Sequence, residues 1–100
     1  MRQDGGPRAL ARRADKDPRH LAKVRRLPCE VCGRPGPNDA HHRTGGGMGT
    51  KMPDTATIPL CSQHHRDFHD LTGPFKGWTK ERLREWQIRA VMKTLERLGI

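Results

Sequence analysis

Cysteines and histidines gather in the middle of the chain in two interleaved groups. The first group is a Cys-x-x-Cys pair followed by a Cys-x-x-His pair: Cys29, Cys32, Cys61 and His64. The second group contains imidazoles alone, as His-His followed by His-x-x-x-His: His41, His42, His65 and His69. A tetrahedral zinc takes four ligands, so these side chains are too many for one ion. The pattern therefore predicts two metal sites of different chemistry.

The thiol-rich group has the composition and spacing of a structural zinc site, because thiolates are ligands that suit zinc. The alternative is that the three cysteines are buried, reduced thiols without a metal. Two correctly spaced ligand pairs favour zinc. Three cysteines would also leave one unpaired in an intramolecular disulfide framework, so we expect a reducing compartment.

The imidazole group can be divided by the geometry of the elements that carry it. On a helix, which turns about 100° per residue, His65 and His69 lie within roughly 40° of each other. His64 points elsewhere on the same helix, so one helix can serve two metals. Neighbours on a strand face opposite ways, so of His41 and His42 one can bind metal while the other faces a substrate. Three ligands and one free imidazole are what a one-metal nuclease requires.

The elements that must position these groups follow from caps, prolines and apolar spacing. Asp17-Pro18 starts a helix that Pro28 stops. Residues 39–43 and 55–60 are expected to form strands, joined through a glycine-rich loop over 45–49. A short helix over 61–70 ends before Gly73-Pro74, and Thr79 caps a long helix reaching about residue 98. The apolar stripe of that helix is expected to be core: Leu83, Trp86, Ala90, Val91, Leu95 and Leu98.

Length and charge limit the remaining possibilities. A chain of 100 residues makes one small α+β domain over 17–98, and residues 1–16 are expected to be a flexible basic arm. The net charge of +9 favours a polyanionic partner, above all DNA, over solubility alone. Four basic residues within or beside the histidine group are the expected DNA contacts: Arg43, Lys51, Arg66 and Lys76. Without an apolar span or signal segment, a cytoplasmic protein that does not enter a membrane is expected.

The segments AHHRTGGGMGT and IPLCSQHHRDFH together resemble the HNH (ββα-metal) endonuclease superfamily. The histidine subset is similar to that of the colicin nucleases, and the added cysteine pairs resemble the zinc-knuckle branch. The whole also looks like small phage and prophage HNH proteins, some of which are linked to recombination. The resemblance covers about residues 29–69. It implies two antiparallel strands and a helix wrapped on a catalytic metal.

Carried over by position, the resemblance assigns His41, His65 and His69 to the catalytic metal, and His42 to the general base. That metal would be Zn²⁺, Ni²⁺, Mn²⁺, Co²⁺ or Mg²⁺, in addition to the structural Zn²⁺. The middle asparagine of the family pattern would fall at Ala56. Asp54, Thr55 or Thr57 could replace it out of register. Asp54 could alternatively ligate the metal or support a ligating imidazole.

Three functions remain open at this point. The first is a DNA endonuclease, which uses both groups. The second is a zinc-stabilised nucleic-acid-binding module with a degenerate nuclease site, which the departure at Ala56 favours. The third is a zinc domain that binds proteins, which the positive charge disfavours. Retention of all four imidazoles favours the endonuclease, because binding alone needs only the zinc knuckle.

Overall fold

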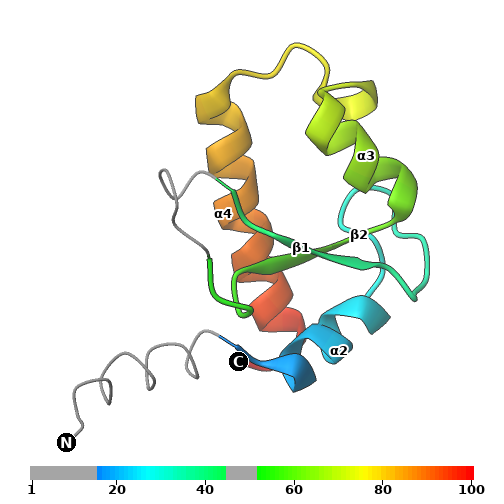
Figure 1. The fold of residues 1–100 in the computed structure, drawn as a ribbon, viewed down its shortest axis with the longest axis vertical. Helices are drawn as coiled ribbons and strands as arrows, with labels where there is room; N and C mark the ends of the chain where they lie inside the picture. Colours follow the sequence, from blue (N-terminus) through cyan, green and yellow to red (C-terminus); the bar gives the residue numbers. More distant parts are fainter. Residues whose placement is uncertain (1–15, 45–51) are drawn as a thin grey trace, which may run out of the picture.

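The computed structural model describes residues 16–44 and 52–100. Along the chain it contains α2 (Pro18–Arg26), β1 (Asp39–His42), β2 (Thr57–Leu60), α3 (Ser62–Asp70), the 3-10 helix η1 (Gly73–Phe75) and α4 (Lys80–Arg97). This is a small α+β fold, as predicted (Figure 1). The predicted arm over 1–16 lies outside the described residues except for Lys16, and so do the glycine-rich loop and Lys51.

The two strands form an antiparallel ribbon whose register sets the positions of the histidines. His41 pairs with Ile58 and His42 with Thr57. Every residue of β2 is buried, because α2 and α4 both pack against this strand. Figure 1 shows the ribbon crossing α4, with α3 and α2 at opposite ends of the molecule. The ribbon is therefore the centre on which the three α-helices assemble.

Local signals in the sequence set the helix boundaries. The Asp17 carboxylate accepts a hydrogen bond of 3.0 Å from the His20 amide, and Thr79 Oγ1 accepts one of 3.1 Å from the Arg82 amide. Both contacts satisfy an amide at a helix N-terminus that would otherwise lack a partner. Cys61 is the N-cap of α3, which ends at Leu71 in a left-handed conformation. The predicted starts of these helices are confirmed to within a residue.

The core forms where the cysteine segments meet the ribbon and α4. Its buried members are Cys29, Ile58, Leu60, Cys61 and Ala90, with Val31, Trp86 and Val91 packed around them. The predicted apolar stripe of α4 is only partly right, since Leu83, Leu95 and Leu98 stay partly exposed. Gln87, Ala90 and Thr94 are the buried residues of α4. A two-stranded ribbon is narrow, so it covers only those positions of the helix that face it directly.

An aromatic cluster fixes α3 relative to α4. The Phe75 ring lies 5.2 Å from that of Phe68 on α3 and 5.1 Å from that of Trp86 on α4, centroid to centroid. Phe68 also contacts the His41 imidazole at 4.8 Å. Edge-to-face packing of this kind stabilises a defined orientation of the rings. The cluster therefore holds the helix that carries His65 and His69 against the strand that carries His41.

Among the helices of residues 16–44 and 52–100, none has both the length and the apolar character needed to cross a membrane.

Candidate metal centres and active site

The thiol-rich group comes together as the first of two compact ligand clusters. Cys29, Cys32, Cys61 and His64 place their ligand atoms within 4.8 Å of one another and could hold a metal ion. The sulfurs of Cys32 and Cys61 are 4.0 Å apart, and the Cys61 sulfur is 3.3 Å from Nδ1 of His64. Two sulfurs bound to one tetrahedral zinc at about 2.3 Å lie roughly 3.8 Å apart. The spacing thus fits a single ion.

The turn that carries Cys29 and Cys32 brings backbone amides close to the Cys29 sulfur. Gly33 has φ of 77°, a conformation that costs a glycine little, and its amide donates to the Cys29 carbonyl at 2.8 Å. Burial raises the pKa of the Cys29 thiol, but backbone hydrogen bonds from Cys61 and Cys32 outweigh it and lower the pKa to about 6. The thiolate, which is the metal-binding form, is therefore favoured near neutral pH.

The imidazole group forms the second cluster, from β1 and α3. His41, His65 and His69 bring one nitrogen each to within 4.8 Å of the others. His41 is buried, His65 is partly buried and His69 is exposed, so the cluster is closed on one side and open on the other. His42, the fourth imidazole of the group, does not belong to this cluster. Its side chain is 38% exposed and points away from the buried ring of His41, because neighbouring residues of a strand face opposite ways.

Hydrogen bonds to Gln87 determine the tautomer of His41. Oε1 of Gln87 accepts from the Thr44 amide at 2.8 Å and lies 3.0 Å from Nε2 of His41. A backbone amide can only donate, so the side-chain oxygen must face it, and Nε2 of His41 must carry the proton. Nδ1 then keeps its lone pair for a metal. Burial lowers the pKa of His41 to about 4, which keeps the ring in the neutral form that binds metals.

His65 has a similar partner on its outer side. Its Nδ1 lies 2.9 Å from Oδ2 of Asp39, the first residue of β1. A carboxylate accepts the proton of Nδ1 and leaves Nε2 with its lone pair. Metal-binding histidines in proteins usually donate their second nitrogen to a carboxylate or carbonyl in this way. Two of the three clustered imidazoles therefore have the outer hydrogen bond typical of metal ligands.

Asp54 binds His42 and belongs to neither ligand cluster. Its Oδ1 lies 2.8 Å from Nε2 of His42, and its Oδ2 accepts from the Asp17 amide at 2.7 Å. The sequence had left Asp54 open as a metal ligand or as the partner of a ligating imidazole. In the structure, Asp54 instead forms a hydrogen bond with His42, the expected base. Nε2 of His42 is the donor in this contact, so Nδ1 carries the lone pair.

The predicted DNA contacts lie on different elements. Arg43 directly follows β1, where its amide donates to the Ala56 carbonyl at 2.8 Å. Arg66 is exposed on α3, next to His65, and Lys76 is exposed just after η1. Lys51 lies outside the described residues. His20, which the sequence placed outside both ligand groups, is buried on α2.

Comparison with known proteins gives a family but no activity. The family model described as "Protein of unknown function (DUF968)" matches residues 10–97. The chain belongs to this DUF968 family. The DUF968 chain is also similar to "Uncharacterized protein YdfU" of Escherichia coli (strain K12), with 45% identity over 56 residues. That match covers 53% of this chain and 16% of YdfU. No solved structure matches the DUF968 chain.

Three residues beside the site carry contacts that sequence reasoning missed or left open. Gln87 was absent from the predicted stripe of α4, Asp39 was read only as the start of a strand, and Asp54 had several possible roles. Each contacts a histidine distant in sequence, by 46, 26 and 12 positions respectively. The available signal for Asp54 is its place two residues before Ala56, where the family pattern has its middle asparagine. Nothing local marked Gln87, since only the packing of α4 brings it to His41.

Proposed function

We propose that this protein is a metal-dependent DNA endonuclease of the HNH type. The observation that carries the proposal is the division of the four imidazoles. Three of them could share one ion, while His42 stands apart and is held by a carboxylate. The order of β1, β2 and α3 along the chain is the order expected from the resemblance, and it supports the same reading.

The donor atoms fit the two metals that this function needs. Three thiols and one imidazole suit zinc in a structural role, with Cys29, Cys32, Cys61 and His64 as its ligands. His41, His65 and His69 would hold the catalytic metal and leave a coordination position open. A divalent ion there would supply positive charge that stabilises the phosphate and the leaving 3′ oxygen. The exposed edge of the cluster at His69 gives a substrate access.

His42 is the general base in this proposal. Its Nε2 donates to Asp54, so Nδ1 is free to accept a proton from the attacking water. The carboxylate fixes the ring orientation and favours the protonated imidazole that forms during attack. Asp54 thereby does the bracing that the family's middle asparagine would do, from a position two residues before Ala56. Hydrolysis leaves 5′-phosphate and 3′-hydroxyl ends.

A plasmid-nicking assay tests the proposal directly. Purified protein is incubated with supercoiled plasmid and each of Mg²⁺, Mn²⁺, Co²⁺, Ni²⁺ and Zn²⁺, alongside the His42→Ala variant. We expect nicking with at least one metal, and a rate loss of about 10²–10⁴-fold in the variant, the usual contribution of a general base. Matched DNA affinity in the two proteins would show that the loss lies in the chemical step.

The opposite outcome has a clear meaning. Suppose the wild type binds DNA and retains metal in both clusters but nicks with none of the five ions. The endonuclease proposal then fails, and the zinc-stabilised nucleic-acid-binding module replaces it. Nicking at equal rates by wild type and His42→Ala would also refute the proposed base.

A further inference from the structure

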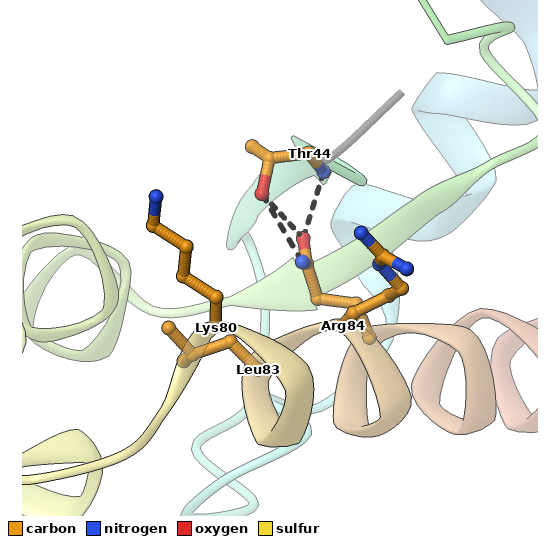
Figure 2. Close-up of a pocket in the computed structure, with 5 residues that line it drawn as sticks. Thr44, Lys80, Leu83 and Arg84 are labelled. Carbon is orange, nitrogen blue, oxygen red and sulfur yellow. Dashed lines mark hydrogen bonds between the residues drawn. The ribbon is translucent and has the colours of Figure 1, made fainter. Parts of the chain in front are cut away.

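A pocket opens beside the imidazole cluster, and its lining includes none of the three described residues predicted to contact DNA, Arg43, Arg66 and Lys76. It is lined by Thr44, Lys80, Leu83, Arg84 and Gln87 and has a volume of about 170 Å³. Thr44 follows β1, and the other four residues belong to the first turns of α4. Figure 2 shows Lys80 and Arg84 rising from the helix on either side, with Thr44 facing it from above.

The two cations at this pocket are not engaged by other groups in the described part of the chain. Within residues 16–44 and 52–100, neither Lys80 nor Arg84 forms an ion pair or a side-chain hydrogen bond. Lys93 and Arg97, further along the same helix, instead approach Glu30 at 3.7 and 3.5 Å. The positive charge at the start of α4 is thus available to an anion, whereas the two cations near its end already share the Glu30 carboxylate. Leu83 adds an apolar side chain to the lining of the pocket.

Gln87 belongs both to the lining of the pocket and to the surroundings of the proposed active site. Gln87 contacts the His41 ring and the Thr44 backbone at the same time, so the pocket and the imidazole cluster are fixed relative to each other. Only Arg43 separates the proposed base His42 from Thr44, and two residues of extended chain span about 7 Å. One DNA strand advances about 3.4 Å along its axis per nucleotide. The Thr44 edge of the pocket therefore lies within about two nucleotide steps of the proposed base His42.

We propose that the Lys80–Arg84 pocket binds a backbone phosphate of the DNA strand being cut, one flanking the scissile phosphate. The proposal rests on the endonuclease function and extends it, since it assigns a substrate subsite to the start of α4. Lys80 and Arg84 neutralise the phosphate, while the hydroxyl of Thr44 stays hydrogen-bonded to the Gln87 amide. Leu83 packs against the neighbouring sugar. A phosphate held here sets the register of the strand on the metal cluster.

The test measures DNA affinity against salt concentration for single variants of α4, in the His42→Ala background so that no cleavage intervenes. Arg84→Ala and Lys80→Ala remove one positive charge each from the pocket. Arg89→Ala is the matched control, because Arg89 is exposed on the same helix and roughly 140° around it from Arg84. All variants are checked for wild-type helix content and thermal midpoint. The probe is a short duplex of mixed sequence, with inorganic phosphate measured separately.

We expect each pocket variant to lower the slope of log affinity against log salt by about 1 and to weaken binding several-fold at low salt, whereas Arg89→Ala leaves the slope unchanged. Pocket variants that behave like Arg89→Ala would overturn the proposal. So would binding of inorganic phosphate to this pocket with no effect of the variants on DNA, since that assigns it to a free anion. If the wild type never cleaves but the slopes still change, the nuclease fails and the subsite stands.

Discussion

The imidazole of His42 and the carboxylate of Asp54 are 2.8 Å apart, from Nε2 to Oδ1, and the second carboxylate oxygen accepts the backbone amide of Asp17. Both oxygens are therefore acceptors at once. This arrangement holds the ring from behind and leaves its other nitrogen free. It also links the expected base to the start of α2, because Asp17 is the residue that caps this helix.

Asp54→Asn should lower kcat with little change in KM. An asparagine has one acceptor oxygen, and the Asp17 amide can only donate, so the new NH₂ group is left to face His42. That contact favours the tautomer with the proton on Nδ1, the nitrogen that must accept a proton. The measurement is steady-state plasmid cleavage together with the His42 tautomer from nitrogen chemical shifts.

Asp70→Asn is the control for this variant, since Asp70 is exposed at the end of α3. Comparable rates for Asp54→Asn and Asp70→Asn would contradict a positioning role for Asp54. An unchanged His42 tautomer in a slow Asp54→Asn variant would contradict the proposed reason for the loss.

The two neighbouring histidines of β1 should respond differently to alanine substitution. His41→Ala removes one of three clustered ligands, so the second metal should bind more weakly and excess metal should restore part of the activity. His42→Ala should retain the metal and not be rescued by it. Metal titrations of cleavage, with calorimetric affinities for the same ions, distinguish the two variants. Rescue of His42→Ala by metal, with none for His41→Ala, would show that the roles are reversed.

The thiol-rich cluster should retain one zinc per chain through purification without added metal, and Cys29→Ala should unfold the domain. Cys29 and Cys61 are buried core residues as well as proposed zinc ligands, and the free energy of binding a structural zinc is available to folding. Elemental analysis and circular dichroism measure the two effects. A low dose of EDTA should stop cleavage before it removes helix signal. A folded protein with less than half an equivalent of zinc would contradict the structural site.

The stability of the fold should fall as pH decreases from about 6.5 towards 4, partly through His41. Burial lowers its pKa from 6.5 to about 4, so the unfolded chain takes up a proton that the folded ring does not. Its contribution is complete above pH 6.5 and is lost as the pH falls to 4, up to about 3 kcal/mol. Denaturant unfolding across this range, after the imidazole cluster is stripped with a weak chelator, should show a steeper decline for wild type than for His41→Asn. If the stability of both proteins falls in parallel with pH, this role of His41 is contradicted, because any stability lost with zinc at low pH is the same in both.

Local chemistry explains why so much of the backbone could be predicted. Asp17 and Thr79 cap their helices through contacts three residues away, and prolines and glycines punctuate the remaining boundaries. The two ligand clusters were predictable for a similar reason, since Cys-x-x-Cys, Cys-x-x-His and His-x-x-x-His are short-range spacings. Their grouping in space needed only the pairing of β1 with β2 and the position of α3.

The outer partners of the histidines could not be predicted because they depend on tertiary packing. Gln87 lies beside the predicted apolar stripe of α4 and is not part of it, yet its side chain is buried against His41 and Thr44. Its position depends on how α4 crosses a ribbon of only two strands. The choice of Asp54 as the partner of His42 depends similarly on where the start of α2 is anchored.

Adjacent residues of α3 serve the two clusters, with His64 in one and His65 in the other. A single turn of α3 thus connects the two binding equilibria. An ion that binds more tightly when α3 is held in this position also favours the position that the other ion requires. Such coupling is reciprocal by thermodynamic necessity. If a zinc in the first cluster preorganises the second, then an ion in the second must strengthen the binding of zinc in the first by the same free energy. Each occupied cluster would protect the other against chelation.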